Sequence, residues 1–254
     1  MILVTGMMRS GTSLVCQVLT KLGQSFGDPG AMIPADRWNA GGYFEVREVM
    51  DVNSRIVTGI SRTTSPVRAW AAKVAYVAMP SVRSMPRRAA RHRATIEDIG
   101  RRYRGAVLKD PRFCLTLRFW REWTEVDRIV VCVRHPASVL HSLARRHSLP
   151  KWLSARFYAW HVNTLVDQLP SSSVVFLDVD RLVDGAADEL EALGRGLGAN
   201  VPAPSSLLDD VVDPDAFTRV DPDAAGCPEV AVAAWQRLRA LAAASRTQPA
   251  GGAS

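Results

Sequence analysis

The first sixteen residues, MILVTGMMRSGTSLVC, constrain the fold of this chain more than any other stretch. A short apolar strand runs into a loop bracketed by Gly6 and Gly11, and the loop opens directly into a helix. Successive backbone N–H groups in a G-x-x-x-x-G loop, together with the helix N-terminus, can hold an anion. The version that binds nucleoside triphosphates ends in Gly-Lys-Ser/Thr, whereas here Thr12 replaces the lysine and Arg9 is the only cation. The loop therefore fits a phosphate but lacks the lysine used for ATP; the ordinary alternative is a tight turn capped by Ser10.

The composition fits a protein with a sizeable apolar core. The chain has 254 residues, enough for one large α/β domain or two small ones. No window approaches the ~20 uninterrupted apolar residues of a membrane span, and no basic segment precedes an apolar run at the start. We therefore expect a bacterial-type cytoplasmic protein. Four scattered cysteines without C-x-x-C pairing predict reduced, mostly buried thiols, namely Cys16, Cys114, Cys132 and Cys227.

The positive charge of the chain is concentrated in one region. The net charge is +7, yet residues 61–105 hold eleven Lys and Arg against two acids, an excess of +9 that leaves the remainder slightly acidic. Such an excess can attract an anionic substrate, a nucleic acid or a membrane surface, and the plainer alternative is a pair of solvated, arginine-rich helices. Aromatic residues are sparse in this region, which argues against single-stranded nucleic acid.

Strands and helices alternate along most of the chain. Apolar β-forming runs predict strands in 2–5, 105–111, 126–136 and 172–182. Helical spacing predicts helices at about 11–22, 46–61, 67–78, 87–103, 112–123, 136–147, 151–169, 185–197 and 229–245. Such alternation predicts the α/β class, with a P-loop-type three-layer fold in which helices flank a central parallel β-sheet. We expect one domain over 1–246 with a helical and loop insertion at about 61–104, a Pro/Asp-rich loop over 201–228, and a disordered tail over 247–254.

Three charged or glycine-rich turns follow the first three predicted strands. They are residues 6–13, 109–112 and 134–136. Because ligands of open parallel sheets bind outside the carboxyl ends of the strands, we expect these turns to meet in one crevice.

Taken together, these turns resemble a known family. The segments VTGMMRSGTSLVCQVL, LKDPRFCLTLRFW and VCVRHPASVLHSLARR resemble sulfotransferases that use 3′-phosphoadenosine 5′-phosphosulfate (PAPS). The nearest resemblance is to the bacterial GMxRSGTS-type branch, whose motifs are similar to those of tyrosylprotein sulfotransferases. The resemblance covers roughly residues 1–60 and 105–197. It implies PAPS as co-substrate, 3′,5′-adenosine bisphosphate (PAP) as product, and no metal ion.

The resemblance assigns roles at both ends of the nucleotide. The loop and the helix N-terminus would hold the 5′-phosphate, through Met8, Arg9, Ser10, Gly11, Thr12 and Ser13. Arg9 would contact the bridging oxygen, and Lys109 matches the catalytic lysine of the tyrosylprotein branch. Arg134 and Ser142 would bind the 3′-phosphate, and Arg146, one turn after Ser142, is a plausible third donor. Arg219 would close over the nucleotide.

The acceptor hydroxyl needs a base to take its proton. Many small-molecule sulfotransferases have a histidine two residues after the strand-end lysine, but Pro111 stands there. The tyrosylprotein branch uses a glutamate after the first helix, and Glu45 is the best candidate for it. Asp36 and Asp110 stay open as alternatives, and His135, His141 and His147 are weaker candidates.

The acceptor itself is open at the level of sequence. Candidate pocket residues are Trp38, Asn39, Tyr43, Phe44 and Trp160, although such aromatics are more often core. We expect a hydroxylated small molecule such as a natural product, or a glycan, with a lipid still open and a protein tyrosine disfavoured. We expect neither nucleic acid nor membrane as a partner. Two other functions are a P-loop kinase, which the missing Gly-Lys pair opposes, and a non-catalytic protein that binds polyanions through residues 61–105.

Overall fold

The protein is a three-layer α/β structure built around a parallel sheet. The computed structural model describes residues 1–36, 39, 41–201, 204–212, 217, 220 and 226–247. Its sheet runs in the order β2-β1-β3-β4, with every neighbouring pair parallel. The strands are β1 (Ile2–Thr5), β2 (Val107–Lys109), β3 (Arg128–Val133) and β4 (Val174–Asp178). The predicted fold class is confirmed.

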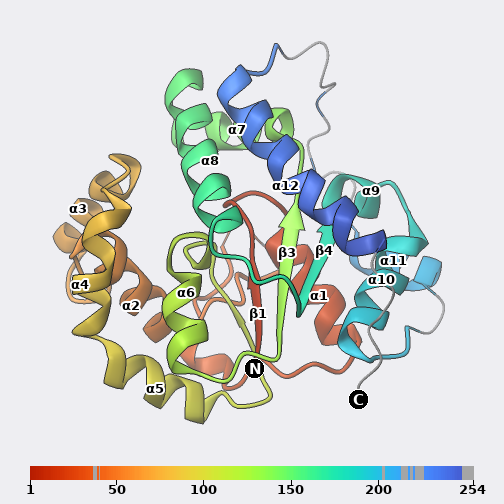
Figure 1. Cartoon of the computed structure of the whole chain (residues 1–254), viewed down its shortest axis with the longest axis horizontal. Coiled ribbons are helices and arrows are strands. Elements are labelled where there is room, and N and C mark those ends of the chain that lie inside the picture. The colour runs from red at the N-terminus through yellow and green to blue at the C-terminus, as the bar shows by residue number, and fades with distance from the viewer. Residues whose placement is uncertain are drawn as a thin grey trace.

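Successive side chains along each strand point to opposite faces of the sheet, and this produces two separate hydrophobic cores. Leu3 and Val131 face one core, whereas Val4 and Val130 face the other. Strands that are apolar on both faces must be covered on both faces. The first core packs against α2 (Arg47–Thr58), α6 (Phe113–Trp123), α8 (Lys151–Val166) and α12 (Glu229–Thr247). The second packs against α1 (Thr12–Lys21), α10 (Ala187–Leu197) and α11 (Pro204–Val211), so the sheet lies between two helical layers (Figure 1).

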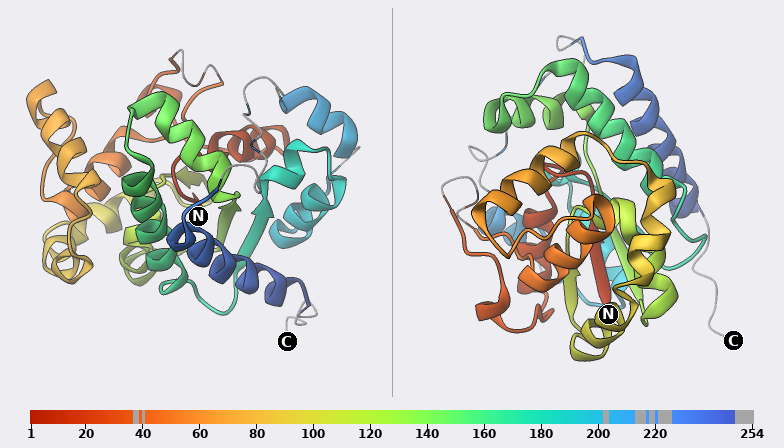
Figure 2. Two further views of the ribbon diagram at one scale, coloured as in Figure 1. Left: turned by 90° about the horizontal axis from the view of Figure 1, so that it is seen from above. Right: turned by 90° about the vertical axis from the view of Figure 1, so that its left-hand side faces the viewer.

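The helices occupy most of the predicted positions. Their bounds are α1 Thr12–Lys21, α2 Arg47–Thr58, α3 Pro66–Val77, α4 Met85–Ala90, α5 Arg93–Arg102, α6 Phe113–Trp123, α7 Pro136–His147, α8 Lys151–Val166, α9 Val179–Val183, α10 Ala187–Leu197, α11 Pro204–Val211 and α12 Glu229–Thr247. Two 3₁₀ turns, Pro29–Ala31 and Val82–Ser84, lie between them. Helices α3 and α4 stand beside the sheet, at one end of the molecule (Figure 2).

Three sequence expectations differ from the structure. The single helix expected over 87–103 is two helices, α4 and α5. They are separated by a turn in which the Arg91 and His92 N–H groups bond to the carbonyls three residues earlier, at 3.2 and 2.8 Å. The loop expected over 201–228 contains α11, whose Leu208 is buried in the second core. The strand expected over 172–182 ends at Asp178, whose carboxylate accepts the Arg181 N–H at 3.2 Å and so caps α9. The tail over 248–254 lies outside the described residues.

Candidate functional site

The carboxyl ends of β1, β2 and β3 bring three distant turns to one edge of the sheet. Thr5 at the end of β1 donates a hydrogen bond from Oγ1 to the Asp110 carbonyl, at 3.4 Å. Arg134, which follows β3, donates from Nη1 to the carbonyl of Arg9 at 2.9 Å. The glycine loop therefore lies between the turn after β2 and the turn after β3, as the strand order requires.

The glycine loop has a backbone that few side chains allow. Gly11 has φ +77°, and a Cβ atom there would lie 2.4 Å from Cγ1 of Val179. Arg9 has φ +70°, a left-handed conformation that is uncommon outside glycine. Gly11 is the N-cap of α1, and having no side chain it makes no capping hydrogen bond. The first N–H groups of α1 remain available to an anion.

The predicted loop residues take different places around this turn. Ser10 and Thr12 are buried, whereas Met8 and Ser13 are half-buried, and Met8 packs against the first core. The Oγ atom of Ser13 accepts a hydrogen bond from Asn39 Nδ2 at 2.9 Å. The segment that contains Asn39 therefore reaches over the start of α1.

Beside the loop, the structure gathers three arginines. Arg9 donates from Nε to Ser142 Oγ at 2.8 Å, which joins the loop to α7. Burial lowers the pKa of Arg9, and the neighbouring charges of Arg146 and Arg134 lower it further. Arg134 is itself buried, and its guanidinium lies 5.2 Å from the ring centre of Phe217. Mutually repelling guanidinium groups of this kind are stabilised by an anion placed among them.

The segment after α1 contacts this arginine cluster through Tyr43. Arg146 donates from Nη2 to the Tyr43 hydroxyl at 2.6 Å, and that hydroxyl donates to Asp36 Oδ1 at 2.8 Å. Burial raises the pKa of Tyr43, and its hydrogen bond to Asp36 raises it further. Asp36 is thus engaged with Tyr43 and lies 3.9 Å from Arg146.

At the end of β2, Lys109 forms a buried ion pair with Glu45. Lys109 donates from Nζ to Glu45 Oε1 at 2.8 Å and to the Tyr43 carbonyl at 3.0 Å. Only 3% of the Lys109 side chain and 11% of the Glu45 side chain are exposed. Burial alone would raise the pKa of Glu45, but Lys109 and Arg112 outweigh burial and lower it. Glu45 is therefore ionised at neutral pH.

Asp110 anchors the turn after β2. Its Oδ1 accepts from both the backbone N–H and Nη1 of Arg112 at 2.8 Å, and its Oδ2 accepts from Asn53 Nδ2 at 3.2 Å. Burial raises the pKa of Asp110, although the Arg112 charge opposes this. Each oxygen of Asp110 already has a protein donor, which fits an anchoring role.

The structure also adds charged residues that the sequence reasoning missed. Asp180 pairs with Arg134 Nε at 3.2 Å and accepts the His135 N–H at 2.7 Å, so it orients the turn after β3. Arg112 lies 3.8 Å from Glu45. The positive charge of Arg62 attracts the Glu45 carboxylate and repels the Arg112 guanidinium. The acidic DVD that ends β4 was a usable signal for Asp180, whereas Arg62 is hidden in a generally basic stretch.

Several predicted residues lie elsewhere. Phe44 packs on Phe26 with ring centres 5.1 Å apart, and Trp160 packs on Tyr76 at 6.0 Å, so both contribute to packing. The His135 side chain accepts the Ala137 N–H at 3.2 Å and thereby caps α7. Trp38, Arg219 and the His147 side chain lie outside the described part of the chain.

The described residues contain no group of three or more His, Cys, Asp or Glu side chains arranged to hold a metal ion. Over the same residues, no helix combines the length and apolarity of a membrane-crossing segment.

Comparison with known proteins finds likeness in structure alone. No protein-family model matches the chain, and no curated protein sequence matches it. The sulfotransferase domain from the Synechococcus PCC 7002 olefin synthase is 14% identical, with a TM-score of 0.49 and coverage of 94% of each chain. The sulfotransferase domain from the curacin biosynthetic pathway is also 14% identical, with a TM-score of 0.43 and coverage of 99% of this chain and 92% of that one. We draw no function from likenesses at this level.

Proposed function

We propose that this chain is a sulfotransferase that moves a sulfuryl group from PAPS to a hydroxyl of a small-molecule or glycan acceptor. The observation that carries this proposal is a pair of neighbouring anion sites at one sheet edge. One is the uncapped start of α1, with its glycine loop. The other is the cluster of Arg9, Arg134 and Arg146 with Ser142. A nucleotide with phosphates at both its 5′ and 3′ positions needs two such sites.

Each part of the donor has a partner in this arrangement. We assign the 5′-phosphosulfate to the loop from Met8 to Ser13, and the 3′-phosphate to Arg134, Ser142 and Arg146. Arg9 bonds to Ser142 from within the loop, so it lies between the two assigned sites. The cationic cluster and the free N–H groups of α1 fit such an anionic ligand. We also propose, on the resemblance alone, that Arg219 closes over the nucleotide.

The transfer itself is a displacement at sulfur. The acceptor oxygen forms a bond to sulfur, the bond from sulfur to the bridging oxygen breaks, and the electron pair leaves with the 5′-phosphate of PAP. Arg9 and Lys109 stabilise the charge that develops on the leaving oxygen. Lys109 suits this role because its compact ammonium group can turn from Glu45 toward a neighbouring anion.

We assign Glu45 as the base that takes the acceptor proton. Its carboxylate is ionised at neutral pH and adjoins Lys109, so base and leaving-group cation lie side by side. The two alternative carboxylates have other partners, because Asp36 accepts from Tyr43 and Asp110 from Arg112. As Lys109 turns toward the leaving oxygen, Glu45 loses its nearest cation and becomes a stronger base.

Ligand-dependent melting tests this proposal against a kinase. We expect PAP to raise the melting temperature, and ATP with magnesium to leave it unchanged, because no lysine stands at Thr12 to contact the β- and γ-phosphates. A shift with ATP and magnesium but none with PAP would refute the sulfotransferase. Labelled PAPS offered with hydroxylated small molecules and sugars, followed by mass spectrometry, then detects the acceptor class.

A further inference from the structure

Arg62 is a half-buried arginine without a partner in the described structure. Its Nε atom is buried and makes no hydrogen bond, and no described residue forms an ion pair with its guanidinium. The arginines around it behave differently, since Arg112 pairs with Asp110 and Arg55 pairs with Asp51. Of the five N–H donors of this guanidinium, the one on Nε is buried without an acceptor, and native proteins seldom leave a buried donor unused. Arg62 therefore requires an explanation that the protein's own contacts do not supply.

The backbone around Arg62 is fixed by a carboxylate of α2. Asp51 Oδ1 accepts from Ser61 Oγ at 2.7 Å, from the Arg62 N–H at 2.7 Å and from the Thr63 N–H at 3.3 Å. These bonds hold the turn between α2 and α3 in one conformation. The Arg62 side chain is therefore positioned by the turn and not by bonds of its own.

The Arg62 guanidinium lies near enough to Glu45 for each charge to act on the other. The charged side chains that act most strongly on it are Arg112, Glu45 and Asp110. Burial lowers the pKa of Arg62 to about 10, and the repulsion from Arg112 contributes to this shift. It remains cationic at neutral pH. Yet Glu45 pairs with Lys109 and Asp110 pairs with Arg112, so both nearby carboxylates are engaged elsewhere.

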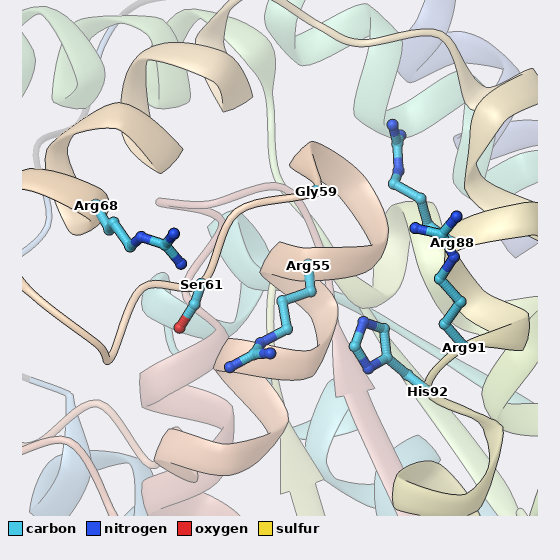
Figure 3. A pocket seen from close by; sticks show the side chains of 7 residues that line it. All are labelled: Arg55, Gly59, Ser61, Arg68, Arg88, Arg91 and His92. Atoms are coloured by element: carbon cyan, nitrogen blue, oxygen red, sulfur yellow. The ribbon is translucent and has the colours of Figure 1, made fainter.

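The other side of the same turn is also cationic. Ser61 lines a cavity of about 140 Å³ whose other lining residues are Arg55, Gly59, Arg68, Arg88, Arg91 and His92. In Figure 3 the guanidinium of Arg68 points toward Ser61, and Arg91 and His92 lie beyond Arg55. Among the described residues Arg68 and Arg91 have no ion-pair partner, so their charge is not offset locally. A positive potential of this kind raises the local concentration of anions.

We infer that the acceptor carries an anionic group, a carboxylate, phosphate or sulfate, and that Arg62 binds this group near Glu45. This inference rests on the proposed sulfotransferase function. The phosphates of the donor and the carboxylate of Glu45 repel an acidic acceptor, and a preorganised guanidinium offsets that repulsion. With its acidic group on Arg62, such a molecule can present a hydroxyl to Glu45. The acceptor class is therefore hydroxy acids and hydroxylated phosphate or sulfate esters.

Paired compounds test this specificity. A panel of aromatic and aliphatic hydroxy acids is compared with the matching methyl esters and primary amides, in the presence of PAP, by ligand-observed NMR. Turnover with PAPS is measured on the same panel. For the unsubstituted chain we expect the best acids to exceed their neutral partners by roughly tenfold or more, as a charge-assisted hydrogen bond provides. In Arg62→Gln this preference should fall to about one, whereas Arg62→Lys should keep part of it.

Two controls separate a specific contact from general attraction and from folding. Arg83→Gln removes one exposed cation from the same basic segment and should leave the preference unchanged. Arg62→Gln should melt no lower than the unsubstituted chain, because Arg62 makes no side-chain bond that its loss would break. Its affinity for PAP should also be unchanged.

The inference is overturned if no acid in the panel exceeds its neutral partner, or if Arg62→Gln keeps the full preference. It is also overturned if Arg83→Gln loses as much preference as Arg62→Gln, or if Arg62→Gln loses affinity for PAP, which would place Arg62 in the donor site. Failure of the unsubstituted chain to bind PAP refutes the sulfotransferase proposal instead. The two failures are therefore distinguishable.

Discussion

The ion pair between Glu45 and Lys109 gives an unequal response to removal of its two members. Five charged groups interact at this edge of the sheet: the cations Arg62, Lys109 and Arg112, and the carboxylates Glu45 and Asp110. Glu45→Gln raises the formal net charge of these five groups from +1 to +2. It also leaves Lys109, whose side chain is 3% exposed, without its carboxylate partner. Lys109→Met lowers the sum to zero, and Glu45 still has Arg112 at 3.8 Å.

Breaking a buried ion pair from one side costs about 3–5 kcal/mol of unfolding free energy. We expect Glu45→Gln to approach that range and Lys109→Met to cost about 1–3 kcal/mol, because Arg112 partly replaces the lost cation. For a chain of this size, each kcal/mol lowers the melting temperature by about 2–4 °C. The double variant should cost less than the sum of the two single variants.

Urea denaturation followed by circular dichroism at pH 7 measures all three variants. A cost of Lys109→Met equal to or above that of Glu45→Gln would refute the charge reasoning, as would additive costs in the double variant. Equal costs below 1 kcal/mol would show that water reaches the pair and screens it.

Four further predictions concern binding, turnover, pH and the loop. Arg134→Ala should weaken PAP binding by roughly tenfold or more in calorimetry, since a charge-assisted hydrogen bond is worth about 1.5–3 kcal/mol; unchanged binding would remove the 3′-phosphate assignment. Lys109→Ala should mainly lower kcat, with the Kd for PAP nearly unchanged, and a loss confined to donor affinity would contradict its role. Burial lowers the pKa of His161 to about 4, so the unfolded chain binds this proton more tightly than the folded one. As the pH is lowered from about 6.5 to 4, the free energy of unfolding should decrease by up to about 1.4 kcal/mol per pH unit. A His161→Gln variant should lose this slope. Gly11→Ala should destabilise the fold by about 1–3 kcal/mol in denaturant titrations, because φ is +77° and the added Cβ meets Val179; a neutral result would show that the loop relaxes.

The sequence predicted the elements and the edge where the site forms, but not the pairings within the site. Apolar periodicity reports which residues are buried, and this was enough for the parallel sheet and for the turns that follow β1 to β3. The bond from Lys109 to Glu45 joins residues 64 positions apart, and the bond from Arg9 to Ser142 spans 133. Local patterns carry no information on such partners, because the path of the intervening segments sets them.

The burial of Arg62 could not be predicted from the sequence either. In sequence it is one of eleven basic residues between 61 and 105, and nothing distinguishes it from the exposed ones. Its burial follows from the hydrogen bonds of Asp51 to the turn between α2 and α3, a contact between residues 11 positions apart in irregular backbone. Charge counts therefore located the basic region, but they did not identify Arg62 as a cation of this region that acts on Glu45.

The position of β1 in the sheet has a consequence for the nascent chain. Ile2 pairs with Val107 and Arg128, both more than a hundred residues later, so this strand is synthesised well before either of its partners. Contacts so distant in sequence close slowly, so the early segment must wait unpaired while most of the polypeptide is made. A truncated product that ends before β3 lacks Arg134 and Ser142 of the proposed nucleotide site, and should be inert and prone to aggregation instead of weakly active.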